Sequence, residues 1–137
     1  MIPFTEAFCL YKKCSTFSGM KFFKSFTYAW QGIQYCFKTQ MNFKVHLVLL
    51  FLVMIAGILL KISNIEWLFI ISCSALVLSL ELINTAIEFL CDIVTKEIHP
   101  SIKIIKDLGA AAVLLTAAGS VIIGLVIFLP KIIALFR

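Results

Sequence analysis

The chain has 137 residues, about the length of one domain, and carries a formal net charge of +5. Hydrophobic residues make up 62% of it and its mean hydropathy is +1.08, whereas charged residues make up only 14%. So few charges cannot cover the surface of a water-soluble protein of this size. The composition therefore excludes a soluble protein and predicts an integral membrane protein.

The first segment, residues 1–20, contains short apolar pieces interrupted by Glu6, Lys12 and Lys13. No run is long enough for the core of a signal peptide, and no small-residue cleavage site follows. We predict an N-terminal extension without an assigned role, followed by a single membrane domain over residues 21–137.

An amphipathic helix is predicted over residues 21–38, because apolar residues recur there at helical spacing. One face carries Phe22, Phe26, Ala29, Ile33 and Phe37, and the opposite face carries Lys24, Thr27, Gln31 and Lys38. Basic residues facing an aromatic stripe are typical of a helix that lies in the membrane interface. Packing of this helix on its own protein is the alternative.

The next two apolar segments predict two membrane spans. The first covers about residues 44–61, where Lys44 can snorkel to the surface and extend a short apolar run. A tight connection follows, and the second span covers about residues 66–92, with Trp67 placed as an interfacial anchor.

A third span is predicted over residues 108–129, after a polar loop over residues 94–106. These 22 residues carry no charge, and small residues in 109–112 and 117–120 suit close helix packing. Pro130 is expected to end this helix.

The distribution of positive charge predicts how the chain is oriented. With three spans, the N-terminus and the 94–106 loop lie on the same side of the membrane. Nine of the 12 Lys and Arg residues fall on that side, and only Lys61, Lys131 and Arg137 fall on the other. Since positive residues are enriched in cytoplasmic segments, the N-terminus and this loop are predicted to be cytoplasmic, where ATP is available.

The second span contains a polar stripe that a lipid-facing helix would not tolerate. Glu81, Asn84, Thr85, Glu88 and Asp92 fall within about a third of the helix circumference. A carboxylate near the bilayer centre costs about 2.5–3.5 kcal/mol, so this stripe must face protein, water or a metal ion. Along the helix, Glu81 lies about 21 Å and Glu88 about 32 Å from the start of the span, near the cytoplasmic membrane surface.

A polar stripe at that depth can meet a water-soluble reactant and a lipid headgroup together. Phosphoryl transfer between them needs a divalent cation, groups that steady the phosphate charge, and a carboxylate that accepts the hydroxyl proton. The sequence contains neither a G-x-x-x-x-G-K-[ST] loop nor a G-x-G-x-x-G segment. Soluble kinase folds are therefore excluded, but kinase chemistry is not.

The polar stripe belongs to a longer set of spaced motifs. These are Glu81-x-x-Asn84-x-Ala86-x-Glu88-x3-Asp92, His99-Pro100 and Lys106-Asp107, preceded by Tyr28-Ala-Trp-x-Gly32 and Asn42-Phe-x-x-His46. Together they resemble the pattern of the prokaryotic diacylglycerol kinase / undecaprenol kinase family. The resemblance implies an all-α membrane protein with three transmembrane helices plus an N-terminal amphipathic interfacial helix. It also implies a homotrimer with sites shared between subunits, in the bacterial cytoplasmic (inner) membrane.

The resemblance also implies a role for each matching residue. Glu81 matches the general base that deprotonates the lipid hydroxyl, Asn84 a substrate-binding residue, and Glu88 a ligand of the ATP-bound magnesium ion. The other implied ATP contacts are Lys21, Tyr28, Glu97, His99, Lys106 and Asp107. Lys21 stands where the family can carry an arginine, so a point charge is kept but a bidentate contact is lost.

Gln40 departs from the family pattern. Three residues before Phe43 the family can carry a metal-binding carboxylate, and this chain has Gln40 instead. A glutamine carbonyl can ligate Mg²⁺ but supplies no charge, so the resemblance leaves the ligand arrangement at this corner open.

These observations predict a membrane lipid kinase that uses Mg²⁺ and transfers the γ-phosphate of ATP to the hydroxyl of undecaprenol or diacylglycerol. The segments 42–46 and 99–100 look closer to the undecaprenol branch. We expect ATP, the lipid and further copies of this chain as partners, and no nucleic acid.

Two other functions remain open at this point. A small proton-coupled transporter also uses an intramembrane glutamate, but near the midplane and without need of Lys106-Asp107. A catalytically inactive membrane scaffold of the same fold is motivated by Gln40 alone. Without the resemblance, Glu81 and Glu88 would also fit a polar seam that joins helices.

Overall fold

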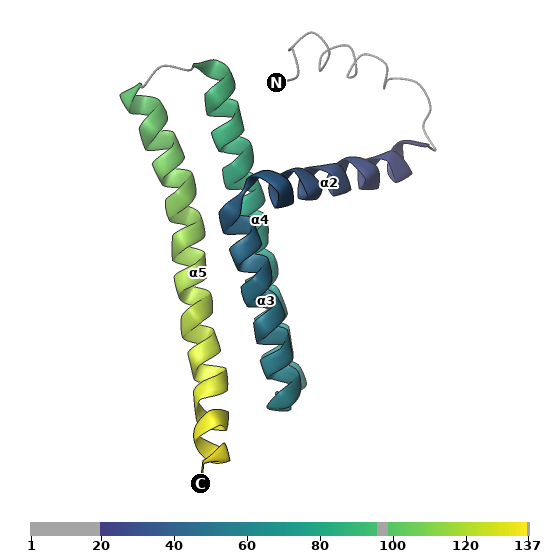
Figure 1. The fold of residues 1–137 in the computed structure, drawn as a ribbon, viewed down its shortest axis with the longest axis vertical. Coiled ribbons are helices and arrows are strands. Elements are labelled where there is room, and N and C mark those ends of the chain that lie inside the picture. Colours follow the sequence, from purple (N-terminus) through teal and green to yellow (C-terminus); the bar gives the residue numbers. More distant parts are fainter. Residues whose placement is uncertain (1–19, 96–98, 137) are drawn as a thin grey trace. The chain divides into compact units, whose positions relative to one another are not determined.

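The computed structural model describes residues 20–95 and 99–136, with only the backbone described for residues 20–23. Within this part the regular structure is entirely helical (Figure 1). The helices are α2 (Met20–Thr39), α3 (Met41–Leu59), α4 (Asn64–Val94) and α5 (Pro100–Leu135). The predicted all-α class is confirmed. The contacts divide the chain into two units, one ending at Gln34 and one covering Tyr35–Arg137, and each is described by itself.

The first unit contains most of α2, which is the amphipathic helix predicted over residues 21–38. All its described side chains, from Lys24 to Gln34, are exposed, including the aromatic residues Phe26, Tyr28 and Trp30. Exposed aromatic and basic residues on one helix agree with an interfacial position. That position stays a prediction.

The second unit contains three helices that are long and apolar enough to cross a membrane: α3, α4 and α5. At 1.5 Å per residue, the 19 residues of α3 extend about 28 Å, close to the thickness of a bilayer core. Large apolar side chains such as Phe51, Leu115 and Val126 are exposed along these helices. Such a surface suits lipid chains or another apolar helix, and the predicted three transmembrane helices are confirmed.

Helix α4 packs against both α3 and α5, and it runs antiparallel to α5 (Figure 1). The buried core lies at the end where α3 turns into α4, around Ile62, Ile70 and Ile127. There the ring of Trp67 packs on the backbone of α3, since a Cβ at Gly57 would lie 2.7 Å from Trp67 Cη2. The polar stripe lies toward the other end of α4.

The start of α4 is fixed by side-chain hydrogen bonds. The Ser63 hydroxyl accepts from the Glu66 backbone N–H at 3.3 Å, and Glu66 Oε2 accepts from the Ser63 N–H at 2.6 Å. This reciprocal capping satisfies two backbone donors that the first turn would leave unpaired. Lys131 Nζ lies 3.1 Å from Glu66 Oε2, so the same carboxylate joins the start of α4 to the end of α5.

Two predicted boundaries were wrong. The loop predicted over residues 94–106 is shorter, because α5 begins at Pro100 with His99 as its N-cap. Proline is favoured in a first helical turn, where its missing N–H is no loss. In addition, Pro130 does not end the third helix, which continues to Leu135. Long helices of membrane proteins tolerate an internal proline because neighbouring groups satisfy the released carbonyl.

Candidate active site

The polar stripe of α4 passes from the protein interior to its surface. Glu81, Asn84 and Thr85 are buried, with exposures of 2%, 6% and 4%. One and two turns further on, Glu88 is half-buried and Asp92 is exposed. The helix therefore presents one deeply buried carboxylate and two that solvent can reach, all on a single face.

Asn84 connects the buried and the exposed part of the stripe. Its Nδ2 donates a 2.8 Å hydrogen bond to Glu88 Oε1, one turn along α4. Its Oδ1 is buried and has no hydrogen-bond partner among the described residues. Gly109 of α5 lies directly against this oxygen, since a Cβ at that position would approach Oδ1 closer than 3.0 Å.

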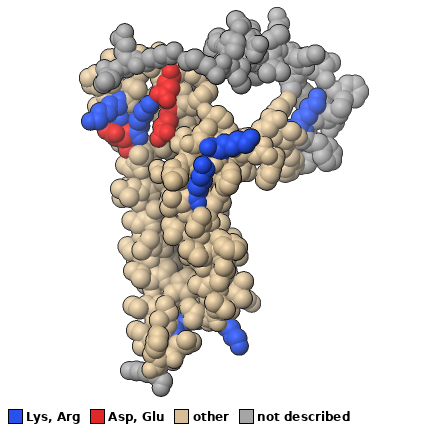
Figure 2. Space-filling view, viewed as in Figure 1, with Lys and Arg blue, Asp and Glu red and all other residues tan. Residues whose placement is uncertain are grey.

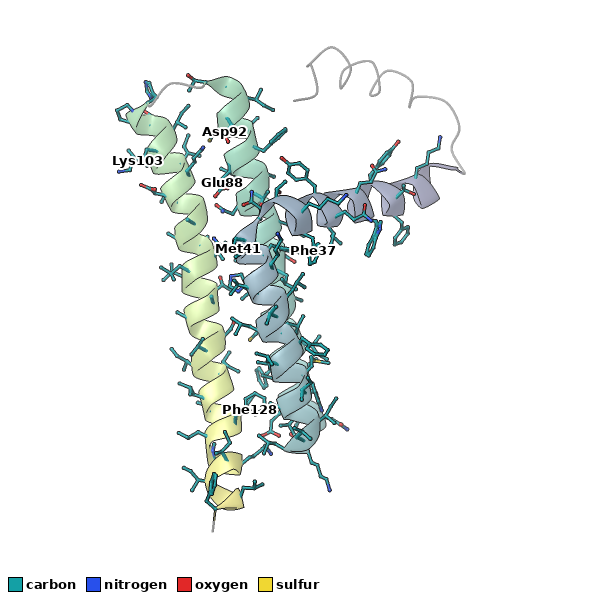
Figure 3. The ribbon with its side chains drawn as sticks, in the orientation of Figure 1. Phe37, Met41, Glu88, Asp92, Lys103 and Phe128 are labelled. Carbon is teal, nitrogen blue, oxygen red and sulfur yellow. The ribbon has the colours of Figure 1, made fainter. Side chains whose placement is uncertain are left out.

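Lys106 of α5 lies beside the exposed part of the stripe. Its Nζ is 2.5 Å from Asp92 Oδ1, and its charge also interacts with that of Glu88. Figure 3 shows Glu88 and Asp92 on the side of α4 that faces α5. On the face drawn in Figure 2, acidic and basic side chains gather at this end of the helix pair, above a broad uncharged surface. Asp107, the next residue, is exposed.

A cavity of about 340 Å³ lies between α3, α4 and α5, and its wall is mostly apolar. His46 lines this cavity and is close enough to Glu81 for their charges to interact. The cavity continues along the helices between residues such as Leu50, Ser74, Val121 and Phe128. His46 therefore lies between the buried Glu81 carboxylate and an apolar cavity that is large enough for part of a hydrocarbon chain.

The junction of α2 and α3 lies at the level of Glu88. The rings of Tyr35 and Phe89 meet edge to face with centroids 6.0 Å apart, and Phe89 is the residue next to Glu88. Gln40 is the N-cap of α3 in this junction, and its side chain makes no capping hydrogen bond. Its amide is therefore not used by the helix end. Its role in metal binding stays a prediction.

The remaining predicted nucleotide contacts are His99, Tyr28, Lys21 and Glu97. His99 caps α5, with Nδ1 accepting from the Ser101 backbone N–H at 3.3 Å. Tyr28 is exposed on α2, in the unit described separately. The side chain of Lys21 and the whole of Glu97 lie outside the described residues. Their roles stay predictions.

The donors present suit a magnesium ion that arrives with a nucleotide. In the described part of the chain, no group of three or more His, Cys, Asp or Glu side chains is arranged to hold a metal. Magnesium bound to ATP needs only one or two protein carboxylates, because the phosphates supply further oxygens. Glu88 fits this requirement, since the bond from Asn84 fixes Oε1 and leaves Oε2 for a ligand.

Comparison with known proteins identifies the family of this chain. Residues 27–128 match the family described as prokaryotic diacylglycerol kinase. The chain belongs to the prokaryotic diacylglycerol kinase family. The chain is 46% identical to an undecaprenol kinase of Bacillus subtilis over 112 residues. This aligned segment covers 82% of this chain and 91% of that protein.

Two further relatives carry the name diacylglycerol kinase. One, from Synechocystis, is 42% identical over 112 residues, covering 81% of this chain and 64% of that protein. The other, from Escherichia coli K12, is 30% identical over 99 residues, covering 72% of this chain and 81% of that protein. The family predicted from the motifs is therefore confirmed, and with it the enzyme class, a membrane lipid kinase.

Within this member of the family, the structure adds three residues to those predicted for the site. Asp92 pairs with Lys106, Gly109 touches Asn84, and His46 neighbours Glu81. Asp92 had a sequence signal, because it continues the polar stripe of α4. His46 had only its place in the Asn42-Phe-x-x-His46 motif, and Gly109 had no signal that separates it from an ordinary packing residue, because their contacts are made between helices.

Proposed function

We propose that this chain is an ATP-dependent lipid kinase of the bacterial cytoplasmic membrane, with Glu81 as the general base. The observation that carries the proposal is the placement of Glu81. It is buried on α4 near His46, which lines an apolar cavity, and Glu88 and Lys106 lie toward solvent on the same helix pair. The buried end of this group of residues, at Glu81 and His46, suits a lipid, and the solvent-facing end, at Glu88 and Lys106, suits a nucleotide.

In the proposed reaction the lipid hydroxyl attacks the γ-phosphorus of ATP while Glu81 takes the hydroxyl proton. A new oxygen–phosphorus bond forms, the bond between the γ-phosphorus and the β–γ bridging oxygen breaks, and ADP leaves with that oxygen. A proton acceptor in hydrogen-bond reach of the attacking group accelerates such a step by about 10²–10⁴-fold.

Glu88 and Lys106 are proposed to receive the nucleotide. Glu88 would hold the magnesium ion of MgATP, whose charge offsets that of the phosphates. Lys106 uses one of its three N–H donors on Asp92, which leaves two for phosphate oxygens. Asp107, His99, Glu97, Tyr28 and Lys21 are proposed as further ATP contacts, and Asn84 as a substrate-binding residue.

The proposed acceptor is undecaprenol, because the B. subtilis undecaprenol kinase shares 46% identity with this chain and aligns along most of both proteins. The apolar cavity beside His46 suits a segment of the polyprenyl chain. We further propose a homotrimer with cytoplasmic sites, since apolar side chains such as Leu115 and Val126 are exposed on the spans and can pack against another copy. The positive-charge bias of the sequence supports the orientation.

Lipid phosphorylation by the purified protein tests this function. The protein is mixed with Mg²⁺ and ATP labelled at the γ-phosphate, in detergent micelles that contain undecaprenol, diacylglycerol or no added lipid. We expect label in the lipid phase with undecaprenol and less with diacylglycerol. Label in neither lipid would contradict the proposed function, and preferential labelling of diacylglycerol would contradict the proposed acceptor.

A further inference from the structure

At Gly109, α5 lies directly against the polar stripe of α4. Three glycines lie in α5, and a Cβ built on Gly119 or Gly124 would meet no heavy atom within 4 Å. A Cβ built on Gly109 would instead run into Asn84 Oδ1, with Asn84 Cγ at 3.4 Å and Ile87 Cδ1 at 3.9 Å. The space left by the missing side chain of Gly109 is therefore filled by the Asn84 carbonyl.

One orientation of the Asn84 side chain suits both Gly109 and Glu88. The amide group is planar, so its carbonyl and its NH₂ group turn together. With Oδ1 seated against Gly109, Nδ2 is directed to Glu88 Oε1 at 2.8 Å. The flipped amide would place its carbonyl oxygen against the Glu88 carboxylate, where two acceptors repel each other.

Packing has to hold this carbonyl, because hydrogen bonding does not. Asn84 is 6% exposed, and its Oδ1 has no donor among the described residues. A buried hydrogen-bond acceptor without a donor destabilises the folded protein. The close packing of α4 and α5 at Gly109 offsets that loss. The same packing keeps the first turns of α5, including Lys106, next to α4.

We propose that Gly109 is a positioning residue of the nucleotide site. It admits the Asn84 carbonyl and thereby directs the Asn84 amide to Glu88, which fixes the carboxylate for the metal of MgATP. This inference rests on the proposed role of Glu88. Gly109 has no side chain to offer a ligand, so the effect that we propose passes through Asn84.

Binding of a fluorescent trinitrophenyl-ATP with Mg²⁺ to the purified full-length protein tests this role without lipid turnover. Gly109→Ala should displace the Asn84 carbonyl and weaken binding by about 10–100-fold, the usual effect of disturbing a partner of a metal ligand. Gly119→Ala is the matched control on the same helix and should bind as the wild type does, because its Cβ meets nothing.

A double-mutant cycle separates positioning from general packing. In an Asn84→Ala background the carbonyl is gone, so adding Gly109→Ala should change binding by less than about twofold. The thermal unfolding midpoint should follow the same cycle, with Gly109→Ala lowering it only when Asn84 is present.

The inference would be overturned if Gly109→Ala bound the nucleotide like the wild type, if Gly119→Ala weakened binding equally, or if the two substitutions were additive. A wild type that binds MgATP but phosphorylates no lipid would reject the proposed function while leaving this test intact. A wild type that binds no nucleotide would overturn both.

Discussion

Asn84→Ala removes two groups whose effects are expected to separate function from stability. The lost Nδ2 donates a 2.8 Å hydrogen bond to a carboxylate, Glu88. Hydrogen bonds to charged groups contribute about 1.5–3 kcal/mol, which corresponds to about 10–150-fold in affinity. The lost Oδ1 is a buried acceptor without a partner, and removing it relieves a penalty of about 1–3 kcal/mol. Stability should therefore change little while the KM for MgATP rises.

Initial rates of undecaprenol phosphorylation at varied MgATP, together with thermal unfolding, measure both effects. Thr116→Val is a suitable control, because it deletes a 2.9 Å side-chain hydrogen bond to Ala112 within α5. It should leave the KM for MgATP unchanged. A folded Asn84→Ala protein with the wild-type KM for MgATP would refute the link from Asn84 through Glu88 to the nucleotide.

Two other substitutions probe the rest of the nucleotide site. Gln40→Glu should lower the Mg²⁺ concentration needed for half-maximal activity, and Gln40→Ala should raise it, because a carboxylate adds charge beside the ion whereas an amide supplies only a dipole. Identical magnesium titrations for the wild type and both variants would place Gln40 outside the metal shell. Asp92→Asn should raise the KM for MgATP, because Lys106 loses the negative charge of the carboxylate that orients it across the 2.5 Å contact. Kinetics at several salt concentrations check this, and an unchanged KM at low salt would show that Asp92 does not position Lys106.

Most of the fold follows from composition and periodicity. Three long apolar segments and one amphipathic segment correspond to α3, α4, α5 and α2, because a bilayer admits few alternatives to helices. The two wrong boundaries involve proline. Pro100 suits a first turn and so starts α5 early, and Pro130 is tolerated inside it. The polar composition of residues 94–106 predicted a loop, but His99 caps a helix that begins within this segment.

The site was predictable as a stripe but not as a set of contacts. Helical spacing places Glu81, Asn84 and Glu88 on one face of α4, and burial follows from that face meeting other helices. Which residue of α5 meets which residue of α4 depends on the packing of two helices, to which a single sequence gives no register. The contacts of Asp92 with Lys106 and of Gly109 with Asn84 came only from the structure. The proximity of Lys106 to Glu88 suits a nucleotide site better than a proton-coupled transporter.

Glu81 is the residue on which the proposed chemistry depends most directly, and Glu81→Gln tests it with an isosteric side chain. The substitution keeps the volume of a residue that is 2% exposed, so the fold and MgATP binding should be retained. The measurement is the turnover number for transfer of labelled phosphate to undecaprenol, with MgATP binding and thermal unfolding recorded on the same preparation. Loss of the general base should lower turnover by about 10²–10⁴-fold. Near-normal turnover in a folded, nucleotide-binding Glu81→Gln protein would contradict the proposed mechanism.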